Sequence, residues 1–312
     1  MEETGQAQQT PEVSVLIVSE DNARALRRCL TALEASAERE TFEILVVDNG
    51  SQDESPHLDS EFPNVTLLRL PRRFGFVKAL NIGMRTAKGE YFFFLAPEAE
   101  VERSTVAGLK KGLAAEAGVV AVCPLLVDAE GRPQPQCYRL PDPSSIIRLA
   151  RRQRFEPVET TVLGDQEMPV AFPSLAALMI RKYFLRGLRY IDERYGQTWA
   201  DAEIAAQVRR ASRRILLLPE VRVLLHPPEL PELRSEARVR ALYAADWALG
   251  AAAFAGKHYG LAVGLKVRLA VAAEGLLAAL ASLARLRDVS YHFRRAAFLL
   301  SGQKLNGTQP FL

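Results

Sequence analysis

The chain has 312 residues, of which 48% are hydrophobic and 25% are charged, a composition typical of a folded protein and not of a disordered one. The net charge is only +3, but residues 231–312 alone carry a surplus of six positive charges. A basic tail on a weakly acidic body indicates an anionic partner; because the tail has few aromatic side chains, we expect no nucleic acid binding and favour a membrane surface.

The cysteines, the N-terminal residues and the lengths of the apolar runs indicate the cellular compartment in which we expect the protein. Cys29, Cys123 and Cys137 form no CxxC pair, which argues against a disulfide framework or zinc site and suits a reducing cytoplasm. The polar start, 1–11, is predicted to be disordered and does not resemble a signal peptide. No uncharged apolar run reaches about 18 residues, so a conventional transmembrane helix is not expected.

Strands and helices alternate through the first hundred residues. Apolar runs predict strands at 13–18, 42–48, 65–70 and 90–95, and helical spacing predicts helices between the first two strands and at 76–87. This alternation predicts an α/β fold with a mainly parallel sheet and flanking helices. Ligands of such sheets bind beyond the carboxyl ends of the strands, where Ser19, Asp48 and Glu98 fall.

The second half of the chain is less regular. A helix is predicted at 101–116 and is followed by a loop-rich region, 124–168, that we expect to cover the sheet edge and face substrate or lipid. This region contains a run of arginines: Arg148, Arg151, Arg152 and Arg154. Strand-like segments at 175–180 and 215–227 flank a helix that starts near Asp201, and 231–312 is predicted to be a helical extension.

Several acidic residues and one histidine are candidates for chemistry. Asp48 is either a turn residue or a hydrogen-bond acceptor for a nucleotide base or ribose. Glu98 and Glu100 suit either a helix start or a site for Mg²⁺ or Mn²⁺ on a diphosphate. Asp201 is either a helix cap or a general base. His226, at a strand end, is either structural or a metal ligand.

The order of these segments resembles the family 2 glycosyltransferases, which have the GT-A fold, and especially their rhamnosyltransferase-like branch. The resemblance covers about residues 12–230. It rests on the segments VSVLIV, VVDNGSQDES, FPNVTLLRLPRRFGFVKALNIGMRTAKGEYFFFL, LLVDAEGRPQPQCYRLP, ALMIRK, ADAEIAAQVRRA and PEVRVLLHP, in that order.

The resemblance assigns roles by position. It implies that Asp48 contacts the donor base, that Ser19 lies in the nucleotide pocket and that Asn81 and Gly83 border this pocket. Ala96-Pro97-Glu98 falls on the Asp-x-Asp metal motif. The remaining implied roles are the catalytic base for Asp201 and a metal ligand for His226.

Four departures weaken the implied site. The family's Thr-Tyr-Asn after the first strand is Ser19-Glu20-Asp21 here, and alanine replaces an acid at both Ala96 and Ala200. Leu175 replaces a glycine near the acceptor. The metal site is thereby reduced to Glu98 and His226, so Mg²⁺ or Mn²⁺ is expected to bind weakly and only with the donor.

The resemblance implies an inverting enzyme that moves a sugar from a nucleotide-diphosphate-sugar to a glycan or lipid-linked acceptor, with Arg73 or Lys78 helping the leaving diphosphate. Resemblance to this branch implies a cytoplasmic protein that acts at the inner face of the plasma membrane, and a homodimer is compatible with it. Two alternatives remain open: a binding or scaffolding protein on the same fold, and a helical tail that packs on the body instead of on lipid. A nucleotidyltransferase is disfavoured because no glycine-rich phosphate loop follows the first strand.

Overall fold

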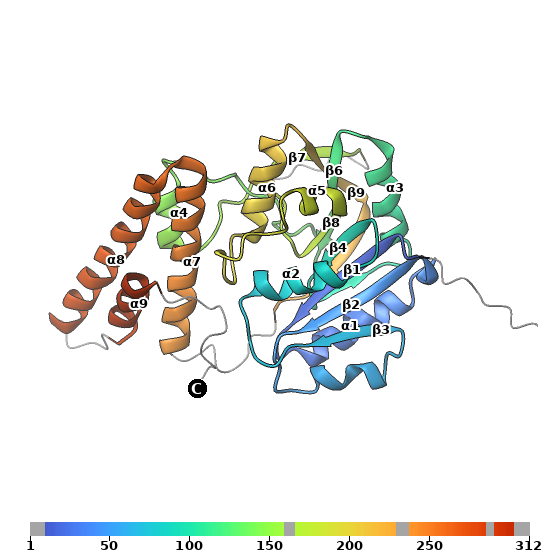
Figure 1. Cartoon of the computed structure of the whole chain (residues 1–312), viewed down its shortest axis with the longest axis horizontal. Helices are drawn as coiled ribbons and strands as arrows, with labels where there is room; N and C mark the ends of the chain where they lie inside the picture. The colour runs from blue at the N-terminus through green and yellow to red at the C-terminus, as the bar shows by residue number, and fades with distance from the viewer. Residues whose placement is uncertain (1–9, 159–165, 229–236, 285–289, 303–312) are drawn as a thin grey trace, which may run out of the picture.

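The computed structural model describes residues 10–158, 166–228, 237–284 and 290–302 (Figure 1). The expected disordered start lies almost entirely outside the described residues. The described chain forms a mixed α/β unit with a helical region at one side.

The first half of the sheet is parallel, as predicted. β1 (Val13–Ser19) lies between β2 (Phe42–Asp48) and β4 (Tyr91–Leu95), and β3 (Val65–Arg69) forms the outer edge. Register places Ser19 directly beside Asp48, so the carboxyl ends of β1 and β2 meet.

Helices cover both faces of this parallel half because β1 is apolar on both sides. Val13, Val15 and Ile17 belong to the core beneath α1 (Ala23–Glu34), whereas Leu16 belongs to the core beneath α2 (Phe76–Thr86). Short 3₁₀ turns connect these elements at Arg39–Thr41 and Ser55–Ser60.

The second half of the sheet is mixed. β8 (Ala177–Arg181) runs antiparallel between β4 and β6 (Val119–Val127), and β9 (Arg214–Leu225) runs parallel to β6. Two short strands, β5 (Ala99–Val101) and β7 (Met168–Val170), pair antiparallel with β9. The helices of this half are α3 (Thr105–Ala115), α4 (Ile146–Arg152), α5 (Lys182–Gly187) and α6 (Ala200–Arg210).

Two predicted boundaries are wrong. The helix expected at 101–116 begins only at Thr105, because Ala99–Val101 pairs with β9. The loop-rich region expected from 124 begins instead with the last residues of β6. This strand tolerates Pro124 because the ladder with β9 is irregular between Pro124 and Leu125.

The C-terminal helical region consists of α7 (Ala237–Tyr259), α8 (Leu261–Ala284) and α9 (Ser290–Ser301). Gly260, at φ +100°, makes the turn from α7 into α8. The two helices then pack closely, because a Cβ added at Gly264 would lie 2.6 Å from the carbonyl oxygen of Ala252. The predicted helical extension is therefore present.

Helix α8 lies at the outer edge of the helical region (Figure 1), and it carries several exposed leucines. They are Leu261, Leu265, Leu269, Leu276, Leu277, Leu280 and Leu283. By length and composition α8 could cross a membrane, although 28% of its apolar stretch is buried inside the structure. Counting uncharged residues missed this segment because single charged residues such as Lys266 and Glu274 interrupt it.

Candidate functional site

A cavity of about 570 Å³ opens at the carboxyl ends of β1 and β4, a size suited to a small ligand. Its sheet wall includes Val18 and Ala96, and α2 contributes Phe76. The wall opposite comes from the start of α6, from α7 and from the segment after α4. Side chains from these parts include Thr198, Trp199, Asp201, Trp247, Arg154 and Phe155.

Asp201 is the residue of this cavity best suited to accept a proton. Within the described chain, its carboxylate accepts hydrogen bonds only from backbone N–H groups, with Ala202 N at 2.9 Å from Oδ1. Burial raises the pKa of Asp201 to about 6. A carboxylate with this pKa is charged at neutral pH and more basic than an exposed one, as a general base requires.

Two polar atoms beside Asp201 are buried without a hydrogen-bond partner among the described residues. They are the hydroxyl oxygen of Thr198 and Nε1 of Trp199, and both residues line the cavity. Buried polar atoms are normally paired, so a ligand with hydroxyl groups would satisfy them.

Ser19 and Asp48 lie together behind the cavity wall at the other end of the site. Both are buried, and their neighbours Glu20 and Asn49 line the cavity. Ser19 Oγ donates a 2.6 Å hydrogen bond to Asn22 Oδ1, and burial raises the pKa of Asp48. The structure thus brings the two predicted nucleotide residues together at one strand edge.

The predicted metal residues lie close together, but they are not arranged as a ligand set. Glu98 lines the cavity, and Ala96 beside it offers no ligand atom. His226 Nε2 lies 2.7 Å from Glu100 Oε1, and Arg28 Nε lies 3.5 Å from the same oxygen. The described residues contain no group of three or more His, Cys, Asp or Glu side chains that could hold a metal ion. This donor set does not fit a resident divalent cation.

Residues 14–184 match the family model described as glycosyl transferase family 2. The chain belongs to this family. A Haloferax volcanii protein described as glycosyltransferase AglE is 32% identical over 90 residues, which are 27% of this chain and 30% of that protein. The chain therefore spans less than a third of this relative.

Solved structures confirm the expected GT-A fold of this family 2 chain. A structure of GalNAc-T7 with UDP, GalNAc and Mn²⁺ has a TM-score of 0.58 at 19% identity, covering 75% of this chain and 48% of that one. A mannosyltransferase from Pyrobaculum calidifontis, in complex with GDP-Man and Mn²⁺, has a TM-score of 0.52 at 19% identity. That match covers 95% of this chain and 88% of the other.

Arg73 and Lys78, which were predicted to help the leaving diphosphate, contact other groups in the structure of this family 2 chain. Arg73 forms ion pairs with Asp21 and, at 3.7 Å, with Glu20. Lys78 Nζ lies 4.7 Å from the centre of the Phe74 ring. Neither residue is among the described residues that line the cavity.

Asn81 and Gly83 of α2 lie away from the cavity lining. Asn81 Nδ2 donates to the carbonyl oxygen of Ile191 at 2.8 Å, and its Oδ1 accepts from Ile191 N at 3.2 Å. A Cβ added at Gly83 would lie 2.9 Å from Val47 Cγ2. In this structure Asn81 therefore holds the 191 loop, and Gly83 allows α2 to approach the sheet.

Helix α7 supports the segment that presents Asp201. Trp199 precedes α6 in a left-handed conformation, with φ 74°. Its ring centre lies 5.7 Å from that of Trp247 and 5.4 Å from that of Phe254, both on α7. Gly250 leaves room for this ring, because a Cβ there would lie 2.6 Å from Trp199 Cδ1.

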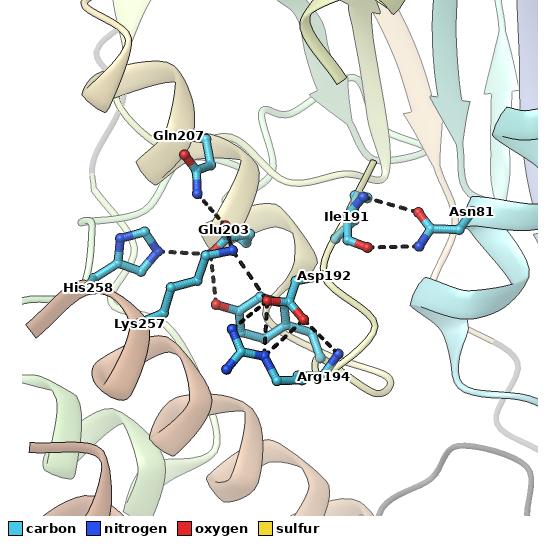
Figure 2. A network of polar contacts seen from close by, with 9 residues as sticks. Asn81, Ile191, Asp192, Arg194, Glu203, Gln207, Lys257 and His258 are labelled. Carbon is cyan, nitrogen blue, oxygen red and sulfur yellow. Dashed lines mark hydrogen bonds and ion pairs between the residues drawn. The ribbon is translucent and has the colours of Figure 1, made fainter. Parts of the chain in front are cut away.

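A buried carboxylate, Glu203, joins α6 to α7 through the network in Figure 2. Oε1 accepts hydrogen bonds from Gln207 Nε2 at 2.7 Å and Lys257 Nζ at 2.8 Å. Oε2 accepts one from the Tyr195 hydroxyl at 2.7 Å and lies 2.8 Å from His258 Nε2. Burial opposes the charge on Glu203, but these hydrogen bonds prevail and lower its pKa to about 2.

The network extends from Glu203 to the loop that Asn81 holds (Figure 2). Lys257 Nζ also lies 3.3 Å from Asp192 Oδ2, which Arg194 contacts at 2.7 Å. Sequence reasoning missed Glu203 as a site-building residue because its two cationic or ring partners, Lys257 and His258, come from α7, more than fifty positions away. Its position two residues after Asp201 was the one local signal.

Proposed function

We propose that this family 2 chain is an inverting glycosyltransferase that moves a sugar from a nucleotide-diphosphate-sugar to a hydroxyl of a glycan or lipid-linked acceptor in cell-surface polysaccharide synthesis. The observation that carries the proposal is the Asp201 carboxylate, which lies in the wall of a ligand-sized cavity without a side-chain partner among the described residues. Its pKa of about 6 suits it to take a proton from a hydroxyl at neutral pH.

The reaction proceeds in a single displacement. Asp201 accepts the proton of the acceptor hydroxyl, the acceptor oxygen attacks the anomeric carbon, and the bond to the nucleoside diphosphate breaks. The orphaned hydroxyl of Thr198 and Nε1 of Trp199 offer hydrogen bonds to sugar oxygens beside this base. The nucleotide lies at the strand edge formed by Ser19 and Asp48.

A divalent metal has no assigned step in this mechanism, because the donor set present in the chain does not fit a resident ion. Mg²⁺ or Mn²⁺ would enter only together with the donor phosphates, with Glu98 of the predicted metal motif as a carboxylate ligand. In that case the ion would neutralise diphosphate charge.

We also propose a peripheral contact with the inner face of the plasma membrane through α8. Its exposed leucines lie along one side of the helix, with Leu265 57% exposed and Leu280 63% exposed. The basic surplus of residues 231–312 favours an anionic lipid surface. Such a contact would bring the cavity near lipid-linked acceptors.

A binding or scaffolding protein is the second candidate, and the reduced metal motif favours it. Ala96 offers no ligand, and His226 contacts Glu100. Turnover separates the two functions: a transferase releases nucleoside diphosphate from one of a panel of nucleotide-sugars, whereas a binding protein raises its melting temperature with ligand and releases none.

The decisive variant is Asp201→Asn, which removes the proton acceptor and little else. We expect at least about a hundredfold loss of kcat with donor affinity nearly unchanged. The matched control is Glu40→Gln, which makes the same change from carboxylate to amide at an exposed position outside the cavity lining. Near-normal turnover in Asp201→Asn would refute the assignment of the base.

A further inference from the structure

The arginines of α4 and of the segment just after it lie in two kinds of environment. Arg148 pairs with Glu156 at 2.7 Å, and Arg151 pairs with Glu274 of α8 at 3.2 Å. Arg154 instead lines the cavity, and it has no acidic partner among the described residues. An exposed arginine in a ligand-sized cavity is available for an anion.

The backbone around Arg154 is fixed by its neighbours. Gln153 ends α4 in a left-handed conformation, with φ 54°, so the chain turns sharply there. Phe155 then enters the aromatic cluster, with its ring centre 4.9 Å from that of Trp199 and 4.8 Å from that of Trp247. Arg154 is therefore attached to the same packed cluster that presents Asp201.

The charge of the cavity explains why a cation is needed there. Among the described residues that line it, Glu20, Glu98 and Asp201 are acidic and Arg154 is the one Lys or Arg. Arg73, from outside the lining, offsets the charge of Glu20. A diphosphate entering this cavity adds more negative charge, and repulsion between like charges in a partly buried site is costly. The carboxylates present do not form a site for a resident metal.

We propose that Arg154 binds the diphosphate group in this cavity in place of a resident metal ion. Its planar guanidinium can donate two parallel hydrogen bonds to phosphate oxygens. The proposal rests on the proposed transferase function. The diphosphate has two possible sources, the nucleotide donor and a lipid-diphosphate acceptor, and the experiment separates them.

The test measures binding of nucleoside diphosphates by isothermal titration in excess EDTA, with Arg154→Gln, Arg154→Lys and the unaltered protein. Arg152→Gln is the matched control, because Arg152 is exposed on the adjacent turn and does not line the cavity. We expect Arg154→Gln to weaken binding by about 10- to 100-fold, as for loss of a charged hydrogen-bond pair. Arg154→Lys should recover part of this loss, and Arg152→Gln should bind normally.

A second arm measures KM for a polyprenyl-diphosphate-linked sugar acceptor in detergent. A normal nucleotide affinity with a raised acceptor KM in Arg154→Gln would assign the diphosphate to the acceptor and still support the proposal. Unchanged values in both arms, with thermal melts confirming folded protein, would overturn it. If the unaltered protein bound neither diphosphate, the proposed transferase function would fail as well, and this result differs from a failure of Arg154 alone.

Discussion

Replacing Glu203 by glutamine tests whether the C-terminal helices hold the helix that carries Asp201. The substitution keeps the size of the side chain and removes its charge. One of the two oxygen atoms becomes an amide nitrogen, which cannot accept the bonds that the carboxylate receives on both sides (Figure 2). Lys257 would keep Asp192, at 3.3 Å, as its one negatively charged partner among the described residues.

The pKa of Glu203 sets the expected magnitude. Folding lowers it from 4.5 to about 2, and the residue is only 3% exposed. At about 1.4 kcal/mol per pH unit, the charged network contributes about 3 kcal/mol to the free energy of unfolding. This agrees with the roughly 3–5 kcal/mol lost when one partner of a buried ion pair is removed.

The sign of the pH dependence follows from the lowered pKa. The contribution is fully present above the unfolded pKa of 4.5 and is lost as the pH falls through about 2. About 2 kcal/mol of it is already absent at pH 3. Urea unfolding at pH 6 and pH 3 measures this difference directly.

We expect Glu203→Gln to be about 3 kcal/mol less stable than the unaltered protein at pH 6 and to lose correspondingly less stability between pH 6 and pH 3. Glu40→Gln, at an exposed position, serves as the control and should change neither value. Equal stability of Glu203→Gln and the unaltered protein at pH 6, with the same pH slope, would refute the reasoning.

Three further outcomes are expected. Because burial raises the pKa of Asp201 to about 6, kcat should be flat above this pH and fall about tenfold per pH unit below it; full activity at pH 4.5 would contradict a base role. Calorimetry should detect no Mn²⁺ binding to the free protein, and Ala96→Asp should tighten Mn²⁺ binding in the presence of nucleoside diphosphate, so that no gain would count against a weakened metal motif. A Leu265→Gln, Leu280→Gln double variant should sediment less with anionic vesicles than the unaltered protein, whereas Tyr183→Gln, exposed on α5, should not; equal sedimentation of all three would exclude the α8 contact.

The parallel half of the fold was predictable because its signals are local. Each strand there is a short apolar run followed by turn-forming residues, and the helices between them place their apolar residues on one face. The second half depends on pairings between distant segments. Ala99–Val101 becomes a strand because β9 lies beside it, and no local pattern distinguishes it from a helix start.

The residues of the candidate site also fall into two groups: those that the sequence predicts and those whose roles depend on contacts between distant segments. Asp201 and Glu98 were found by position, and both line the cavity. The partners of Asn81 and Arg73 could not be read from the sequence, because Ile191 lies 110 residues from Asn81 and Asp21 lies 52 residues from Arg73. Arg154 could be separated from its neighbouring arginines only once the fold had paired Arg148 and Arg151 with acids and left Arg152 outside the cavity lining.

Helix α7 is as much a part of the site as the sheet is. Asp246 is buried, accepts a 2.9 Å hydrogen bond from Gln197 N and fills the space beside Gly196, so it shapes the segment that leads to Asp201. Trp247, the next residue, lines the cavity. Deleting residues 233–312 would therefore remove part of the cavity wall together with α8. Such a deletion cannot separate membrane contact from catalysis, whereas substitutions on the exposed side of α8 can, because they leave the contacts of α7 with α6 in place.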